Sequence, residues 1–341
     1  MRIRSTLLAM AASFLLLAPP GTGRAQDATG GGSAFPAALY AKWISMAKAQ
    51  GGPAILFNPA EGSSVGQSRM LAQEIDFTVA GMPMPKARRD EAGVLQFPAV
   101  IGAVVCIHNI PGVPDGQLKL NAELLAKIFT GGITHWNDKA ITALNQGIAL
   151  PDMEIKPISL RDGGMDATYG LTQYILAANP DWRQKHGAVV TKRWAIGSTV
   201  VNSVDMVEVV KVIPGSIGYT AYGLALRNNA PMVALRNPAG NYIAPGLPGI
   251  AAAAARADWA GSADLVMTLV NQPGAESYPI AQTSYVQMLL RPRYIPRSQA
   301  VRDFFDFGYR NGGAVAAEFG FVPLPEAVQQ RVRDTWERIG S

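Results

Sequence analysis

The chain has 341 residues, of which 48% are hydrophobic and 16% are charged, with a formal net charge of +5 at pH 7. This composition is typical of a globular protein with room for two domains, and it argues against a disordered or membrane-spanning chain. Three arginines (Arg2, Arg4 and Arg24) lie within the first 25 residues, so the charge of the remainder falls from +5 to +2. A charge this small does not favour a nucleic-acid-binding protein.

The first 25 residues have the pattern of a secretory signal peptide. Two arginines precede an apolar run at 7–18, and two prolines and a glycine end that run. The run is shorter than the roughly 20 residues of a membrane-spanning helix, and an uncleaved anchor is the alternative interpretation. No cysteine lies nearby, which argues against a lipid anchor. We therefore predict cleavage after Ala25 and export to the periplasm.

Residues 26–32 are polar and rich in glycine, which predicts a flexible N-terminus. From residue 33 onward, segments with helical periodicity alternate with short apolar segments typical of strands. Helices are predicted at 35–49, 64–74, 121–129, 138–145, 167–178, 204–212, 249–258, 298–311 and 324–339. Strands are predicted at 54–58, 77–82, 96–110, 155–160, 216–219 and 285–290. The alternation predicts an α/β fold with parallel-rich sheets, and two such domains could hold a ligand between them.

The first candidate ligand-binding segment is Gly62-Ser63-Ser64-Val65-Gly66, which follows a predicted strand and opens a predicted helix. The first turn of a helix presents free N–H groups and a partial positive charge, and small residues let an anion approach them. The hydroxyl groups of Ser63 and Ser64 would add two donors. The alternative is that one of these serines only caps the helix.

The second candidate is the loop from Arg161 to Asp166, which also joins a predicted strand to a predicted helix. A guanidinium group can hold an oxyanion through two hydrogen bonds, and glycines such as Gly163 allow close approach of the backbone. The alternative is an ordinary turn in which Arg161 pairs with Asp162 or Asp166.

The third candidate is the loop at residues 32–36, which precedes the first predicted helix. Its N–H groups, including that of Phe35, could line the same site as the other two loops. The alternative is a local helix cap with Pro36 near the first turn.

The sequence has no recognisable catalytic or metal-binding pattern. His108, His135 and His186 lack the spacing of a metal site, and neither a nucleophile elbow nor a phosphate-binding loop occurs. The single cysteine, Cys106, lies in an apolar run and excludes an internal disulfide or a cysteine metal cluster. We therefore predict neither enzymatic activity nor a cofactor or metal.

Short motifs follow one another from residue 34 to residue 280. They are Ala34-Phe35-Pro36, Tyr40-Ala41-Lys42-Trp43, Gly62-Ser63-Ser64-Val65-Gly66, Ile75-Asp76-Phe77, 96–102, Asn109-Ile110-Pro111-Gly112, 128–138, 144–147, Leu150-Pro151, 214–219 and Tyr278-Pro279-Ile280. Each motif alone could arise by chance. Together, in this order, they resemble the phosphate-binding proteins of bacterial phosphate ABC importers.

The resemblance implies a type II periplasmic binding protein, in which two α/β lobes joined by two crossover strands close on a ligand in the cleft between them. Lobe I would comprise residues 33–104 and 281–341, and lobe II would comprise residues 105–280. The crossovers would fall near 104–109 and 279–284. The resemblance also implies a monomer, a small anion as ligand and the membrane permease of an ABC importer as partner.

In that family a dehydrated phosphate is held by hydroxyl groups, backbone N–H groups, one arginine and an aspartate that accepts the phosphate's own proton. By position, Phe35, Ser63 and Arg161 match the family.

The departures are Ala34 for a threonine, Gly81 for the proton-accepting aspartate, Gly163 for a second aspartate, and Met165, Asp166 and Ala167 for a serine-glycine-threonine segment. A slip of one residue would place Asp162 near the lost aspartate. Asp166, if it points inward, would repel an anion, and each lost contact weakens binding by ~1–3 kcal/mol.

Two functions are compatible with these residues. The first is a solute receptor that binds phosphate or a related oxyanion for an ABC importer, using Ser63, Arg161 and the main-chain donors of Phe35 and Ser64. The second is a diverged paralogue that has lost tight phosphate binding and acts as a protein-interaction, secretion or sensing partner in the cell envelope. The first requires that Ser63 and Arg161 converge on one site between the lobes.

Overall fold

The computed structural model describes residues 27–161, 165–179, 182–184, 194 and 196–340. The predicted signal peptide, its cleavage site and the predicted ligand-binding residues Asp162 and Gly163 lie outside these ranges. Within them the strands form an eight-stranded sheet, in the order β2-β1-β3-β11-β4-β8-β6-β7, and a three-stranded sheet, in the order β10-β9-β5. Among the helices so described, none has the length and apolar character needed to cross a membrane.

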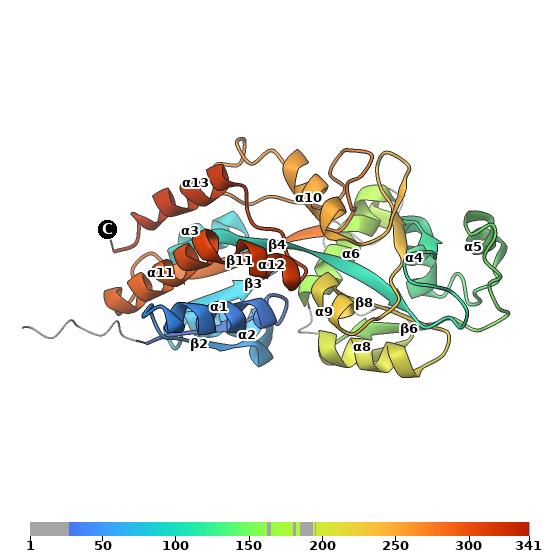
Figure 1. Cartoon of the computed structure of the whole chain (residues 1–341), viewed down its shortest axis with the longest axis horizontal. Coiled ribbons are helices and arrows are strands. Elements are labelled where there is room, and N and C mark those ends of the chain that lie inside the picture. Colours follow the sequence, from blue (N-terminus) through green and yellow to red (C-terminus); the bar gives the residue numbers. More distant parts are fainter. Residues whose placement is uncertain (1–26, 162–164, 180–181, 185–193, 195, 341) are drawn as a thin grey trace, which may run out of the picture.

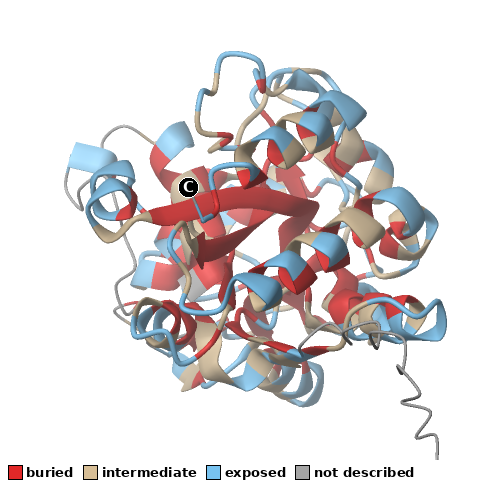
Figure 2. Cartoon of the chain, turned by 90° about the vertical axis from the view of Figure 1, so that its left-hand side faces the viewer, coloured by how far each residue is buried: buried red, intermediate tan, exposed pale blue. Residues whose placement is uncertain are grey.

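The elements are arranged as helices around a central sheet (Figure 1). The strands are β1 (Ala28–Gly32), β2 (Ile55–Asn58), β3 (Phe77–Ala80), β4 (Val94–His108), β5 (Lys119–Leu120), β6 (Lys156–Leu160), β7 (Ser198–Val200), β8 (Ser216–Ala221), β9 (Ala234–Arg236), β10 (Tyr242–Ile243) and β11 (Ala281–Leu289). The helices are α1 (Ala37–Ala49), η1 (Pro59–Glu61), α2 (Gly62–Leu71), α3 (Lys86–Ala92), α4 (Ala122–Thr130), α5 (Lys139–Leu144), α6 (Met165–Ala178), α8 (Ser203–Val212), α9 (Tyr222–Arg227), α10 (Leu247–Arg256), α11 (Ile295–Asn311), α12 (Gly313–Glu318) and α13 (Glu326–Trp336). Figure 2 shows that the central strands are buried and that the helices expose their outer faces.

The long strand β4 joins two halves of the large sheet. All of its residues are buried, which explains its continuous apolar sequence. Its residues Val94–Ala103 pair antiparallel with β11 in the first half, and Val104–His108 pair antiparallel with β8 in the second half. The first half also contains β1 between the parallel strands β2 and β3, and the second contains β6 parallel to β7 and β8. The predicted α/β fold is therefore confirmed.

The prediction of a flexible N-terminus at residues 26–32 is wrong, because Ala28–Gly32 form the buried strand β1. The glycines in this strand are required by packing. A Cβ atom on Gly30 would lie 2.2 Å from Cζ of Phe77, and one on Gly32, whose φ is +125°, would lie 2.3 Å from the Val79 carbonyl oxygen. Here a glycine-rich sequence marks close approach of backbone and side chains rather than disorder.

Most predicted helices and strands are confirmed, with ends that differ by a few residues. The prediction that Ser63 or Ser64 caps α2 is wrong, because both residues lie inside the helix, which begins at Gly62. The sequence analysis missed the short helices α3, α9 and α12 and the short strands β5, β7, β9 and β10. These elements are too short to show a clear periodicity.

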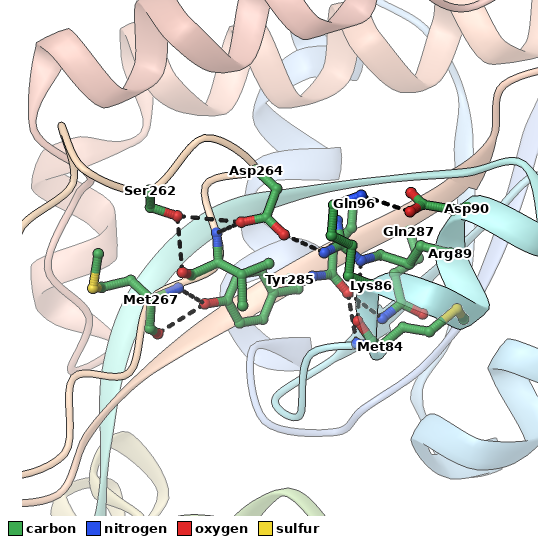
Figure 3. A network of polar contacts seen from close by, with 11 residues as sticks. Met84, Lys86, Arg89, Asp90, Gln96, Ser262, Asp264, Met267, Tyr285 and Gln287 are labelled. Carbon is green, nitrogen blue, oxygen red and sulfur yellow. Dashed lines mark hydrogen bonds and ion pairs between the residues drawn. The ribbon is translucent and has the colours of Figure 1, made fainter.

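The segment that follows α10 packs against the first half of the fold. The hydroxyl group of Tyr285, on β11, donates to the Met267 carbonyl and accepts the Met267 N–H, both at 2.9 Å. Asp264 forms an ion pair with Arg89 of α3 (Figure 3). Arg331 of α13 donates to the Ser262 carbonyl at 2.6 Å. Residues 262–267, which we placed in lobe II, are thus attached to elements that we placed in lobe I.

Candidate functional site

Ser63 and Asp166 meet where the two halves of the fold face each other. Ser63 is the second residue of α2, and Asp166 is the second residue of α6. The Ser63 hydroxyl donates to the carboxylate, with Oγ at 2.9 Å from Oδ1 and 2.8 Å from Oδ2. Their exposed fractions are only 3% and 7%. The contact therefore brings the N-terminal ends of two helices, one from each half, to one buried point.

Two glycines place Ser63 at this point. Gly62, with φ of +72°, allows the backbone to enter α2 in a conformation that other residues rarely adopt. Gly66 lets α2 approach the sheet closely, because a Cβ atom there would lie 2.4 Å from Thr78 Oγ1 and 2.9 Å from the Cα atom of Gly32. The helix therefore packs on β1 and β3 with Ser63 directed toward the other half.

Helix α6 is fixed on the second half by hydrogen bonds from its inner face. The Thr168 hydroxyl lies 2.9 Å from the Tyr219 hydroxyl on β8, and the Tyr174 hydroxyl donates to the Arg236 carbonyl at 2.7 Å. Asp166 lies in the first turn, where a negative charge interacts favourably with the helix dipole. The sequence of α6 thus holds a carboxylate at the boundary between the halves.

Gly81, Met82 and Gln282 complete the contact. The Met82 N–H donates to Asp166 Oδ1 at 3.3 Å. The Gln282 side-chain amide donates to the carbonyl of Gly81 at 2.9 Å and to the carbonyl of Asp166 at 3.1 Å. A Cβ atom on Gly81 would lie 2.8 Å from the Cβ atom of Asp166 and 2.9 Å from its Cγ atom. Nε2 of Gln282 would lie 2.6 Å from the same atom, so the Asp166 side chain and the Gln282 amide together fill the volume in which a side chain at position 81 would begin.

The buried Asp166 carboxylate is held by neutral donors. A buried carboxylate needs compensating charges or donors, and no residue in the described part of the chain forms an ion pair with Asp166. The compensation comes from the Ser63 hydroxyl, the Met82 N–H and the N-terminal end of α6. Donors that come from both halves of the fold in this way can hold an oxyanion.

The predicted site residues of the first loop lie in a different arrangement. The Phe35 N–H, which we predicted to bind the anion, donates to the Ser33 hydroxyl at 3.1 Å. Its ring is half-buried and packs edge-on against Phe321, with the ring centroids 5.4 Å apart. Ala34 and Ser64 are both exposed. In this structure, Ser63 and Gly81 are the predicted residues of the first half that contact Asp166.

Arg161 directly follows β6 and begins the connection that leads to α6 and Asp166. Its N–H donates to the Val200 carbonyl at 2.8 Å, which extends the pairing of β6 and β7. Its side chain is exposed. In the described part of the chain the carboxylate of Asp166 bonds to Ser63 and Met82 rather than to Arg161, and the alternative pairing of Arg161 with Asp162 lies outside the described residues. Met165 begins α6, immediately after the residues that the structure leaves undescribed.

Met82 and Gln282 are not among the site residues predicted from the sequence. Met82 contributes only its backbone N–H, a role that its side chain cannot signal. Gln282 lies on β11, where the neighbouring residues are buried, and a glutamine in such a strand does indicate a buried hydrogen-bonding role.

Two titratable groups are buried in β4, outside this contact. Burial lowers the pKa of His108 to about 4 and raises the pKa of Cys106 to about 12. At neutral pH the imidazole and the thiol are therefore both uncharged. In the described ranges, no three histidine, cysteine, aspartate or glutamate side chains are grouped to hold a metal ion.

A cavity of about 510 Å³ lies in the second half, away from Ser63. Its walls include Asn121 and Glu123 at the start of α4, Tyr174 of α6, and Arg236. The Asn121 side chain accepts the Leu124 N–H at 2.8 Å as an ordinary helix cap. The cavity does not coincide with the predicted site between the lobes.

Comparison with known sequences gives consistent matches along the chain. The sequence profile of the PBP superfamily domain matches residues 18–311. The phosphate-binding protein PstS of Pasteurella multocida is 36% identical over 334 residues, which cover 98% of this chain and 95% of that protein. The phosphate-binding protein PstS of Haemophilus influenzae is 32% identical over 314 residues, which cover 92% of this chain and 93% of that protein.

Solved structures share the fold at low sequence identity. A high affinity periplasmic phosphate-binding protein, PfluDING, superposes with a TM-score of 0.69 at 18% identity, covering 90% of this chain and 93% of that one. A phosphate-binding protein from Stenotrophomonas maltophilia gives a TM-score of 0.69 at 18% identity, with coverages of 91% and 94%. The predicted fold of a type II periplasmic binding protein, with two α/β lobes, is therefore confirmed.

Proposed function

We propose that this chain, which belongs to the PstS family of phosphate-binding proteins within the PBP superfamily, binds phosphate and delivers it to the permease of an ABC importer. This family consists of receptors rather than enzymes. The observation that supports the proposal is the Asp166 carboxylate, which Ser63 and Met82 hold between the N-terminal ends of α2 and α6. A phosphate oxygen has the same need for hydroxyl and N–H donors as a carboxylate oxygen.

The proposed receptor has two lobes that β4 and β11 join. Lobe I contains residues 33–104 and 281–341, to which we now add β1 and the attached residues 262–267, and lobe II contains the remainder of residues 105–280. Strand pairing supports this division, because the partner of β4 changes from β11 to β8 at Val104. Phosphate would bind between the lobes, with Ser63 as a donor from lobe I and Arg161 as the cation from lobe II. Export to the periplasm would follow cleavage after Ala25.

The alternative function, a diverged partner protein of the cell envelope, is favoured by one observation. The donors that an incoming anion would use are already bonded to Asp166. Ala34 and Gly81 also lack the side-chain groups of the family. A protein that has lost its ligand would keep the fold and present only its outer surface to a partner.

Calorimetric titration with phosphate tests the proposal. The chain from Gln26 onward is unfolded and refolded to remove bound anions, and is then titrated at neutral pH. We expect saturable binding that Arg161→Ala weakens about tenfold to a hundredfold, because a charged hydrogen-bonding partner is lost. Arg291→Ala is the matched control, since this arginine is also exposed and lies far from Ser63 along the chain. Absence of phosphate binding in the wild type and in every variant of Asp166 described below would favour the alternative function.

A further inference from the structure

We propose that the Asp166 carboxylate is an internal ligand, which holds the two lobes together in the phosphate-free protein and competes with phosphate for its donors. The identity of the competitor rests on the proposed function above. The internal contact itself rests on the geometry of Ser63, Gly81, Met82 and Gln282 around Asp166.

The hydrogen-bond donors around Asp166 are occupied by its carboxylate. A serine hydroxyl has one proton to donate, and the Ser63 proton is directed to the carboxylate, whose two oxygens lie at 2.8 and 2.9 Å. The Met82 N–H also has a single proton, and it donates to Oδ1 at 3.3 Å. A phosphate oxygen can use either donor only after the carboxylate has left it.

The Asp166 side chain occupies space that an anion at this point would need. The Asp166 side chain lies so close to Gly81 that a single added carbon atom would be 2.8 Å from its Cβ atom. Glycine at position 81 therefore makes room for the aspartate at position 166. An anion entering at this point must displace the Asp166 side chain, because both cannot occupy the same volume.

Backbone carbonyl groups of the two lobes are also joined at this contact. Gln282 is 5% exposed, and its amide nitrogen donates to a carbonyl of each lobe, Gly81 at 2.9 Å and Asp166 at 3.1 Å. This bridge holds the first turn of α6 against lobe I in the position in which the carboxylate reaches Ser63. The contact between the lobes is therefore built from side-chain and backbone groups together.

The negative charge of the Asp166 carboxylate opposes the binding of phosphate. Phosphate and the ionised carboxylate repel each other, and burial strengthens that repulsion because little water screens it. Removal of the carboxylate charge should therefore improve phosphate binding in two ways, by releasing the donors and by removing the repulsion. It should also loosen the contact between the lobes in the phosphate-free protein.

The test uses Asp166→Ala, which removes the carboxylate, and Asp166→Asn, which keeps its volume. We expect phosphate to bind about tenfold to a hundredfold more tightly to Asp166→Ala than to the wild type, with Asp166→Asn between them, since released donors and removed repulsion each change affinity by such factors. Small-angle X-ray scattering of the phosphate-free proteins should give a larger radius of gyration for Asp166→Ala than for the wild type. Asp205→Ala, in the first turn of α8, is the matched control and should change neither quantity.

Gly81→Ala provides a second test that leaves the carboxylate in the chain. The added methyl group overlaps both the Asp166 side chain and Nε2 of Gln282, so it should break the carboxylate contact and the Gln282 bridge together, and the radius of gyration should again increase. Circular dichroism checks that each variant is folded.

Two results would overturn the inference. One is an equal radius of gyration for the phosphate-free wild type and Asp166→Ala, because the carboxylate then does not hold the lobes together. The other is equal or weaker phosphate binding by folded Asp166→Ala, because the carboxylate then does not compete. A protein that binds no phosphate in any form contradicts the proposed function instead, and the scattering experiment still decides whether Asp166 joins the lobes.

Discussion

Arg89 of α3 forms an ion pair with Asp264, which lies 175 positions later in the sequence (Figure 3). Arg89 is only 7% exposed, and its Nε atom also donates to the Met84 carbonyl at 3.0 Å. Ser262 and the Val266 N–H donate to the other carboxylate oxygen of Asp264, both at 3.3 Å. The ion pair thus attaches the segment after α10 to α3.

Replacement of Asp264 by asparagine should destabilise the protein at neutral pH, because the buried Arg89 loses its anionic partner. We expect a decrease of about 1.5–3 kcal/mol in the free energy of unfolding, the usual contribution of a hydrogen bond to a charged group. Urea unfolding at pH 7 measures this. Lys86→Ala is the control, because Lys86 pairs with Asp90 on the exposed surface, where an ion pair contributes at most about 1 kcal/mol.

The effect of Asp264→Asn should depend on pH. Burial acts to raise the pKa of Asp264, but hydrogen bonds from Arg89 and the Val266 N–H outweigh it and lower this pKa below its ordinary value of 3.8. The ionised group therefore contributes stability above pH 3.8, and this contribution is lost as the pH falls through the lower folded-state pKa. The difference between wild type and Asp264→Asn should shrink in that acidic range. A difference that stays constant down to pH 2 would contradict this role for the charge.

Replacement of Ser63 by alanine should reduce the stability of the phosphate-free protein. The change removes a donor from the buried Asp166 carboxylate, and a charged group that loses such a partner typically costs about 1–3 kcal/mol. Ser64→Ala is the matched control, because Ser64 is exposed in the same turn of α2 and its loss should change stability by less than about 0.5 kcal/mol. Equal effects of the two changes on thermal unfolding would contradict the assignment of Ser63 to the contact.

Replacement of Gly30 by alanine should destabilise β1. The new methyl group would overlap the Phe77 ring, whose nearest atom lies 2.2 Å from the added carbon, and overpacking of this kind costs about 1–3 kcal/mol. Gly246→Ala is the control, because its nearest new contact is an ordinary 3.6 Å to Pro248 and its φ of −177° suits any residue. Chemical unfolding of both variants measures the difference, and a neutral Gly30→Ala would mean that β1 does not pack as described.

The sequence alone predicted the elements whose pattern is local. The run from Gln96 to Ile110 indicated one buried strand, because continuous apolar sequence is what burial on both faces requires. Helical periodicity likewise predicted the helix at 121–129, and the structure has α4 at nearly the same residues, with the Asn121 side chain as its cap. The glycines of β1 gave the opposite result, because glycine occurs both in flexible chains and where packing leaves no room for a Cβ atom. Only the position of Phe77 distinguishes these cases.

The candidate site could be predicted only in part, because its contacts join residues that are far apart in the sequence. Position along the chain identified Ser63 and Asp166 separately, as residues of two strand-to-helix junctions. It did not reveal that they contact each other, 103 positions apart. The glycine at position 81 was interpreted as the loss of a side chain, whereas the structure shows that the Asp166 side chain occupies that volume. Such compensation is a property of the packed interior and has no local signature.

The buried His108 should make the protein less stable in mild acid. Burial lowers its pKa from 6.5 to about 4, so between these pH values the unfolded chain binds a proton that the folded protein does not. Stability should therefore fall as the pH decreases from 6.5 to 4, by at most about 1.4 kcal/mol per pH unit from this residue. Urea unfolding at pH 7, 6, 5 and 4 measures the slope.

His108→Gln should reduce that slope, because glutamine does not titrate, although it also loses the hydrogen bond that the Ile110 N–H donates to Nδ1 at 3.4 Å and so lowers stability at every pH. His135→Gln is the matched control, since His135 is exposed and its replacement should leave the slope unchanged. The slope separates the two effects of His108, because the lost hydrogen bond shifts the whole curve whereas the lost proton uptake changes its gradient. Equal gradients in the wild type and His108→Gln would assign the acid sensitivity to other groups.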